Sequence, residues 1–408
     1  MAQPPDMPPA GLFEAAHIPS PAFVIDVGRL AANVAVLDQV QQRTGAKVLL
    51  ALKSYSCWRT FDTLSRFRGG HGPLWGVCAS SVDEARLGRG RFGGEIHAFS
   101  PAWTLQELRE LHNVADHVIF NTPSQWLRWR DAPKAVRRPR NKVAYGLRIN
   151  PERSEVATPI YDPCSPTSHL GIRAKDFSDD LMPGITGLHV HALCENGADA
   201  LVRVLDAVEE RFARWLPQVS WLNFGGGHHI TREDYDLDLL CRTLTAWRNR
   251  YGAQIYLEPG EAVAMNAGWL VATVLDVSAS DIPVAFLDVS ATCHMPDVLE
   301  MPYTPSVCHE SGPSITRAAA PGERPFTCRL VGKSCLAGDV VGTYSFDAPL
   351  KPGQRLVFED MAIYSMVKTT TFNGLRLPAI LVVHCKDDAI DVLQEHAFGY
   401  TDFAGRLG

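Results

Sequence analysis

A single lysine, Lys53, directly follows the apolar run Val48–Leu52. A continuous apolar run of this length is typical of a strand buried on both faces, as in parallel sheets and barrels. A lysine at the end of such a strand, in a partly dry site, can form a Schiff base with an aldehyde such as pyridoxal phosphate. Taken alone, a lysine that marks a strand end and extends into water is the commoner case. Other segments must therefore decide its role.

Two later segments also follow expected strands and carry groups suited to a charged, flat ligand. Asn223-Phe-Gly-Gly-Gly-His-His229 contains three consecutive glycines, whose N–H groups could cradle a phosphate. A flexible connection would use the same residues. Glu258-Pro-Gly-Glu261 places a carboxylate where it could keep a pyridine nitrogen protonated. The alternative for Glu258 is a cap on the following helix.

Several other side chains allow both a chemical and a packing interpretation. His189 and His191 lie two residues apart on one strand, where a histidine could stack on a flat ring or belong to the core. Cys335 could act as an acid, although most buried cysteines only pack. Tyr364 could donate its phenol to a phosphate. A zinc site from His228, His229 and His294 is a third possibility, but adjacent residues of an extended segment point in opposite directions.

The spacing of the apolar segments predicts the elements that must position these residues. About eight βα repeats fit between residues 21 and 267, which is the size and rhythm of a (β/α)8 barrel. From residue 268 onward, short apolar strands alternate with Gly and Pro turns and little helix. We therefore predict an α/β protein with a barrel over residues 29–267 and a β-rich domain over 268–408, to which residues 1–28 contribute a strand.

Composition limits the classes of function. The 408 residues are 46% hydrophobic and 21% charged, as in a globular protein, and the net charge of −6 gives no support for a nucleic-acid partner. No apolar run reaches the length of a membrane span, and the proline-rich start lacks the pattern of a signal peptide. The ten cysteines show no paired spacing, which favours reduced thiols in a cytoplasmic protein.

In their order along the chain, these motifs resemble the alanine-racemase-fold (fold type III) decarboxylases that depend on pyridoxal 5'-phosphate. This group includes ornithine, diaminopimelate and arginine decarboxylases, and the resemblance covers residues 20–385. Three longer strings resemble the branch that decarboxylates carboxynorspermidine and carboxyspermidine. They are Asn223-Phe-Gly-Gly-Gly-His-His-Ile-Thr231, Leu287-Asp-Val-Ser-Ala-Thr-Cys-His-Met-Pro-Asp297 and Met366-Val-Lys-Thr-Thr-Thr-Phe-Asn-Gly374.

The resemblance implies a role for each matching residue. Lys53 would hold the cofactor aldehyde, and Cys335, from the second subunit of a homodimer with shared active sites, would protonate the substrate carbon. The substrate would be a small carboxylated polyamine contacted by Glu261 and Asp297. The residues implied to bind the cofactor, besides Lys53, are Arg148, His191, Gly225, Gly226, Gly227, Glu258, Gly260 and Tyr364.

The sequence also departs from ornithine decarboxylase, and the departures bear on the substrate. Glu261 stands where that enzyme has an arginine for the phosphate, and Leu336 replaces an aspartate that binds the distal amine. Two carboxylates, Glu261 and Asp297, suit the ammonium groups of a polyamine. Lys333, in the loop that carries Cys335, has no explanation at this level.

Rival functions remain open from the sequence. A diaminopimelate- or ornithine-type decarboxylase or a racemase would keep the fold, and a catalytically silent cofactor carrier or polyamine-binding protein would lack the chemistry. Carboxynorspermidine and carboxyspermidine differ by one methylene, which a pocket distinguishes only modestly.

Overall fold

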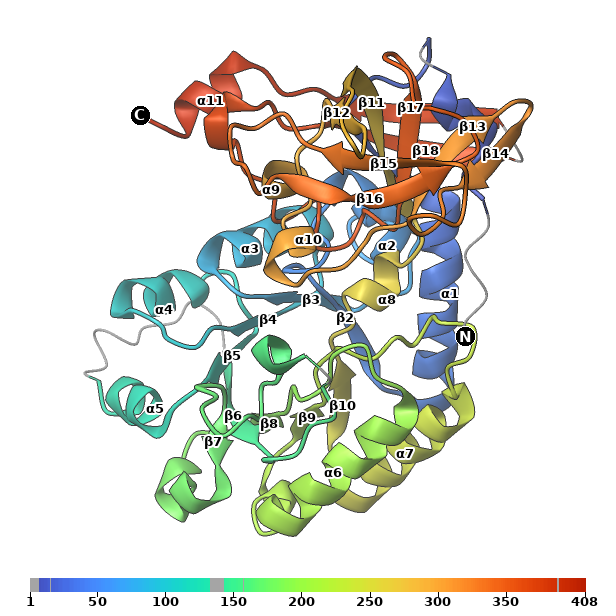
Figure 1. Ribbon diagram of the computed structural model, residues 1–408. Helices are drawn as coiled ribbons and strands as arrows, with labels where there is room; N and C mark the ends of the chain where they lie inside the picture. Colours follow the sequence, from blue (N-terminus) through green and yellow to red (C-terminus); the bar gives the residue numbers. More distant parts are fainter. Residues whose placement is uncertain (1–6, 15, 133–142, 157, 387–388) are drawn as a thin grey trace. The chain divides into compact units, whose positions relative to one another are not determined.

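The computed structural model describes residues 7–14, 16–132, 143–156, 158–386 and 389–408. The chain divides into two compact units. One comprises Ala31–Val263, and the other joins the N-terminal segment up to Leu30 to Ala264–Gly408. Figure 1 shows the two units with their elements labelled.

The first unit is a closed barrel of eight parallel strands surrounded by helices (Figure 1). Pairing between β5 and β6 closes the ring, so the predicted (β/α)8 architecture is confirmed. The short β7 (Ile172–Arg173) pairs with β6 outside the ring. The ring strands are β2 (Lys47–Ala51), β3 (Gly76–Ala79), β4 (Glu95–Phe99), β5 (His117–Phe120), β6 (Ala144–Asn150), β8 (Gly187–His189), β9 (Trp221–Asn223) and β10 (Gln254–Leu257).

Most strand connections of the barrel contain a helix. The exception in the described chain is the path from β6 to β8, where β7 and short 3-10 turns replace an α-helix. The helices are α1 (Val27–Thr44), α2 (Phe61–Leu64), α3 (Val82–Leu87), α4 (Leu105–Leu111), α5 (Pro123–Arg130), α6 (Ala198–Phe212), α7 (Leu237–Tyr251) and α8 (Glu261–Ala264).

An aromatic plug fills the interior of the barrel. Trp221 packs with Leu49, Ile119 and Tyr256 in one buried cluster. Its indole lies directly over Gly187, where a Cβ atom would be 1.9 Å from the ring. A glycine is therefore required at this position, because any side chain would displace the plug.

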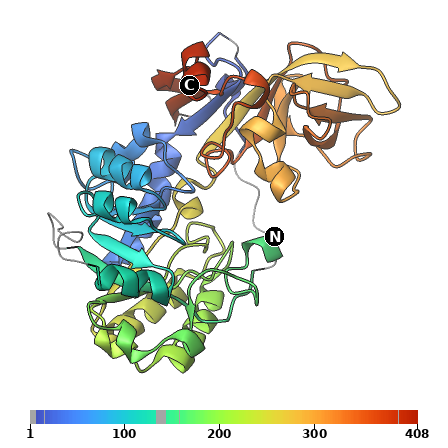
Figure 2. The same ribbon diagram turned by 90° about the vertical axis from the view of Figure 1, so that its left-hand side faces the viewer.

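The second unit is built on a mixed ten-stranded sheet. The N-terminal β1 (Ala22–Asp26) lies between β11, antiparallel, and β18, parallel, and Figure 2 shows this blue strand beside the red C-terminal part. The other strands and helices are β11 (Gly268–Ser278), β12 (Val284–Leu287), β13 (Val307–Ser311), β14 (Ser314–Arg317), β15 (Phe326–Val331), β16 (Val340–Phe346), β17 (Arg355–Glu359), β18 (Ala379–Lys386), β19 (Ala389–His396), α9 (Ala291–His294), α10 (Asp297–Glu300) and α11 (Tyr400–Gly405).

Charged and aromatic side chains gather at the amino-terminal ends of the barrel strands. The rings of His97 and His117 stack with centroids 3.9 Å apart. The Tyr256 hydroxyl donates to Glu95 at 2.7 Å, and the ammonium of Lys47 pairs with the same carboxylate. Burial lowers the pKa of His117 to about 2. Burial alone would raise the pKa of Glu95, but its contacts with His97, Lys47 and Tyr256 outweigh that effect and lower the pKa to about 2.

This cluster predicts a loss of stability in acid. Between pH 6.5 and 2 the unfolded chain protonates His117 while the folded chain does not, so the unfolded state binds more protons and stability falls as pH falls. We expect the free energy of unfolding to decrease on acidification below pH 6.5, with His117 contributing at most about 1.4 kcal/mol per pH unit. Urea unfolding of His117→Gln between pH 5 and 8 should show a shallower dependence. His71→Gln, at an exposed site, is the control and should retain the full slope.

Candidate active site

Lys53 lies in the turn that follows β2, with an exposed side chain between buried neighbours. The turn is fixed to the adjacent strand ends, because the Leu52 N–H donates to the Cys78 carbonyl at 3.0 Å and the Ala51 N–H to the Pro259 carbonyl at 3.2 Å. The charge of Lys53 acts on His191 across the same edge of the barrel. The structure therefore places Lys53 at the carboxyl edge of the strands, where barrel chemistry is located.

The glycine loop is pressed against the ends of its neighbouring strands. Gly225 and Gly227 have φ angles of 68° and 82°, in the left-handed region. A Cβ at Gly227 would lie 1.9 Å from the Leu193 carbonyl oxygen, and one at Gly226 would lie 2.1 Å from that of Glu258. No side chain fits here, so the backbone itself forms the surface. The Gly225 N–H, however, donates to the side chain of Asn223 at 2.9 Å, which leaves fewer donors for a phosphate than the sequence suggested.

Glu258 is a buried carboxylate with two polar neighbours. Asn223 donates its side-chain amide to Oε1 at 2.7 Å, and Nε2 of His189 lies 3.2 Å from Oε2. Burial alone raises the pKa of Glu258, but the adjacent His189 outweighs that effect, and the pKa lies below its ordinary value. Glu258 is therefore held ionised inside the barrel mouth, as an acceptor for a cationic N–H requires.

Arg148 and His191 extend this polar layer. The guanidinium of Arg148 donates to the His191 carbonyl at 2.9 Å and lies 4.6 Å from the centre of the Phe99 ring. Nδ1 of His191 accepts the Gly226 N–H at 3.3 Å. Burial, with the cations of Lys53 and Arg148, lowers the pKa of His191 well below its ordinary value. The ring is therefore a neutral imidazole, suited to packing against a flat ligand.

Gly260, in the Glu-Pro-Gly segment, touches the lysine turn. A Cβ at this glycine would lie 2.5 Å from the Cβ of Ser54. The hydroxyl of Ser54 is buried and has no hydrogen-bond partner among the described residues. A buried hydroxyl without a partner is costly unless a ligand completes it, and this one lies between Lys53 and the glycine turn.

The two adjacent histidines of the glycine loop have separate partners. His228 is buried and bonds to the Tyr235 hydroxyl at 2.7 Å, whereas Nε2 of His229 lies 3.2 Å from a carboxylate oxygen of Glu261. The two side chains thus bind different partners and do not converge on one metal position. Among the described residues, two groups have metal-compatible spacing: Glu95 with His97 and His117, and His189 with His191 and Glu258. Neither group contains His228, His229 or His294, so neither supports the zinc alternative from the sequence.

The second unit carries the other predicted site residues. Cys335 lies exposed at the tip of the β15–β16 hairpin. Asp297 begins α10, and its carboxylate pairs with the ammonium of Lys368. Tyr364 is half-buried, with an unusual φ of 44°. Lys333, which the sequence left unexplained, is exposed in the same loop.

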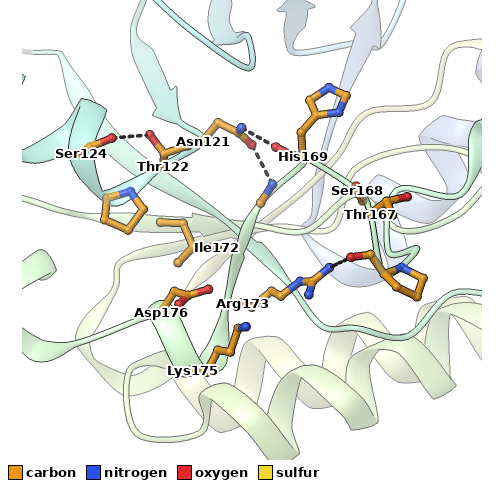
Figure 3. Close-up of a pocket in the computed structure, with 13 residues that line it drawn as sticks. Asn121, Thr122, Ser124, Thr167, Ser168, His169, Ile172, Arg173, Lys175 and Asp176 are labelled. Carbon is orange, nitrogen blue, oxygen red and sulfur yellow. Dashed lines mark hydrogen bonds between the residues drawn. The ribbon is translucent and has the colours of Figure 1, made fainter.

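A pocket of about 610 Å³ opens beyond β5, and no pattern in the sequence indicates it. Figure 3 shows Asn121 bridging its wall, with its side chain accepting the Gly171 N–H at 2.7 Å and donating to the His169 carbonyl at 2.8 Å. Arg173, Lys175 and Asp176 lie on the opposite side (Figure 3). None of the predicted site residues lines this pocket. It arises from the irregular β6–β8 connection, whose loops have no periodic signal.

Sequence reasoning also missed Asn223 and Ser54. Asn223 stands in the quoted glycine string, but its two bonds to Glu258 and Gly225 depend on neighbouring strands. The available signal was a polar residue inside an otherwise buried strand, where an amide needs partners.

Comparison with known proteins agrees with this geometry. A family model described as "Pyridoxal-dependent decarboxylase, C-terminal sheet domain" matches residues 22–362. The chain belongs to the pyridoxal-dependent decarboxylases.

Characterised relatives of this decarboxylase extend over nearly the whole chain. A carboxynorspermidine/carboxyspermidine decarboxylase of Campylobacter jejuni is 39% identical, over 95% of this chain and 98% of that one. A carboxyaminopropylagmatine decarboxylase of Synechocystis is 41% identical, over 96% of both. The crystal structure of the Campylobacter jejuni carboxynorspermidine decarboxylase with norspermidine superposes with a TM-score of 0.82, at 38% identity, covering 95% and 100%.

The residues present fit pyridoxal 5'-phosphate, the cofactor of this decarboxylase family. Lys53 offers an amine to the aldehyde, and the ionised Glu258 offers an acceptor to the pyridine N–H. The side-chain-free loop at Gly225–Gly227 and the unpartnered Ser54 hydroxyl offer a surface and a donor for the phosphate. The residues for the aldehyde and the pyridine nitrogen therefore fit the cofactor well, whereas the phosphate has few free donors in the glycine loop, because the N–H groups of Gly225 and Gly226 already bind Asn223 and His191.

Asn223 should matter for both folding and cofactor binding. Asn223→Ala leaves the Gly225 N–H and one oxygen of Glu258 without a buried partner, so we expect a loss of about 1–3 kcal/mol in the free energy of unfolding and weaker cofactor binding. Chemical denaturation and a fluorescence titration with pyridoxal phosphate measure the two effects. Asn113→Ala is the matched control, since its amide is exposed and bonds only to the Arg109 carbonyl. Equal losses in both variants would contradict the assignment.

Proposed function

We propose that this decarboxylase removes the carboxylate of carboxynorspermidine and/or carboxyspermidine, giving norspermidine or spermidine in polyamine biosynthesis. Two curated relatives with that activity in their names are 39% and 34% identical over at least 95% of this chain. The observation that carries the proposal is the full-length likeness to a solved relative bound to norspermidine. The carboxylates of Glu261 and Asp297 match the positive charge of such a substrate.

The barrel residues hold the cofactor and orient the reaction. With the cofactor bound, Lys53 would hold its aldehyde through Nζ, and Glu258 would keep the pyridine nitrogen protonated. Asn223 donates a hydrogen bond to the Glu258 carboxylate, and the adjacent His189 holds the pKa of that carboxylate below its ordinary value. When bound, pyridoxal phosphate accepts the electron pair that remains as CO2 departs. His191, whose pKa is lowered well below its ordinary value, would pack against the flat ring as a neutral imidazole without adding a positive charge.

Cys335 completes the reaction by donating its Sγ proton to the substrate carbon that has lost CO2. We infer that it acts from the partner subunit of a homodimer, since its hairpin tip is exposed within its own unit. Lys53 would give up the cofactor aldehyde to the incoming substrate amine and would take it back when the amine product leaves. The protein works in the cytoplasm, in keeping with its ten unpaired thiols. Among the described residues, none of the helices combines the length and apolar character needed to span a bilayer.

Asp297 has a local competitor for the substrate ammonium. Lys368 already binds the carboxylates of Asp297 and Glu300. A secondary ammonium group of the substrate therefore shares or replaces this lysine. Such exchange between like charges costs little, because the lysine keeps Glu300 as a partner.

A second candidate substrate is carboxyaminopropylagmatine, because the Synechocystis relative with that activity is 41% identical over 96% of this chain. Its distal group is a guanidinium, which binds carboxylates with two parallel hydrogen bonds. The diaminopimelate-type alternative has weaker support: a diaminopimelate decarboxylase of Helicobacter pylori shares the fold at 14% identity. The second carboxylate of diaminopimelate would need cationic side chains to bind it, whereas Glu261 and Asp297 are anions.

Lys53 is the first test of the proposal. Lys53→Ala removes the amine that binds the cofactor aldehyde, so we expect loss of the long-wavelength absorbance of the bound cofactor and a fall in turnover by orders of magnitude. Absorbance spectra and CO2 release measure these effects. Retained turnover in this variant would exclude the assigned role.

Substrate charge is the second test. Asp297→Asn should raise the KM of carboxynorspermidine about tenfold, which corresponds to about 1.4 kcal/mol of binding, while cofactor binding is unchanged. Glu300→Gln is the control, because Glu300 binds the same Lys368 but is more exposed. Steady-state kinetics with carboxynorspermidine, carboxyspermidine and carboxyaminopropylagmatine decide the substrate. A higher kcat/KM for the last would replace the first proposal with the second.

A further inference from the structure

The loop that carries Cys335 connects β15 to β16 and is anchored at its base by a buried carboxylate. Asp339, only 3% exposed, accepts the Ser334 N–H at 3.1 Å and the Ser290 hydroxyl at 2.8 Å. The Gly332 N–H also donates to the Asp339 carbonyl at 2.9 Å. The base of the hairpin loop is thus fixed to α9, while the tip extends beyond it.

The tip has a contact of its own, to a distant segment of the same unit. The N–H of Cys335 donates to Oδ1 of Asn373 at 2.7 Å. Both residues are exposed, so this bond contributes little to the stability of the fold. Its effect is geometric: it fixes the peptide plane next to the thiol and therefore the direction of the Cα–Cβ bond.

The backbone of Asn373 is held in an uncommon conformation. Its φ and ψ are 57° and 16°, inside a 3-10 turn formed by Phe372–Gly374. Non-glycine residues rarely adopt this region, and asparagine is among the few that tolerate it. Glycine would accept the angles but has no acceptor atom. Asparagine therefore meets both requirements of this position.

The turn itself has firm support. The Thr370 N–H donates to the Cys293 carbonyl at 2.8 Å, and the thiol of Cys293 lies 3.6 Å from the Phe372 carbonyl. On the other side, a Cβ at Gly374 would lie 3.6 Å from the Phe403 ring of α11. The turn that carries Asn373 is thus bonded to α9 and lies beside α11.

We propose that Asn373 is a positioning residue for Cys335, fixing the direction from which the thiol delivers its proton. This inference rests on the acid role proposed above for Cys335. Asn373 touches neither substrate nor cofactor in this role; it acts through the backbone of the hairpin tip. Because misplacing a reacting group by about 1 Å can cost about a hundredfold in rate, a surface hydrogen bond here has a large kinetic effect.

Two substitutions separate the acceptor from the backbone conformation. Asn373→Gly keeps the turn angles and removes the acceptor, whereas Asn373→Asp keeps the acceptor. In Asn373→Gly we expect amide hydrogen exchange of residues 332–339 to accelerate about tenfold, and kcat to fall between about tenfold and a hundredfold. KM and the melting temperature should stay near those of the parent protein. Asn373→Asp should restore slow exchange and most of kcat.

The outcomes distinguish this inference from the proposed function. The positioning role is overturned if Asn373→Gly leaves both hydrogen exchange and kcat unchanged. It is also overturned if Asn373→Asp is as impaired as Asn373→Gly. Cys335→Ala is measured beside them. If that variant keeps full kcat, the acid role of Cys335 fails and the catalytic meaning of Asn373 fails with it, whatever the exchange rates show.

Discussion

The hydrogen bond between Asn223 and Glu258 is the interaction on which the barrel chemistry depends. A carboxylate inside a barrel is unfavourable unless hydrogen bonds and nearby charges compensate for lost water. Asn223 supplies one such bond at 2.7 Å and, through its other atom, fixes the Gly225 N–H. One amide therefore binds the buried carboxylate of Glu258 and also fixes the shape of the glycine loop, while the adjacent His189 keeps that carboxylate ionised.

Much of the barrel and its site could be predicted because the signals are local. Continuous apolar runs such as the one before Lys53 identify buried parallel strands, and their carboxyl ends necessarily share an edge. Lys53, Glu258 and the glycine loop each follow such a run, so their meeting at one edge follows from the strand pattern. Their chemistry was less certain, since a lysine or a glycine has several ordinary uses.

Other features depend on contacts between distant segments, which a single sequence does not display. The pocket behind Asn121 forms where an irregular connection replaces a helix. Likewise, the hydrogen bond between Cys335 and Asn373 joins residues 38 positions apart, and no feature of the sequence around the asparagine predicts this contact.

The aromatic plug around Trp221 divides the barrel into two ends with different tolerances. The end that carries Lys53 is built on loops and buried polar side chains such as Arg148 and Glu258, whereas the opposite end is a close-packed cluster that includes Glu95 and Tyr256. Changes in the loops at the Lys53 end can therefore alter which amine is bound while the close-packed cluster at the other end keeps the scaffold.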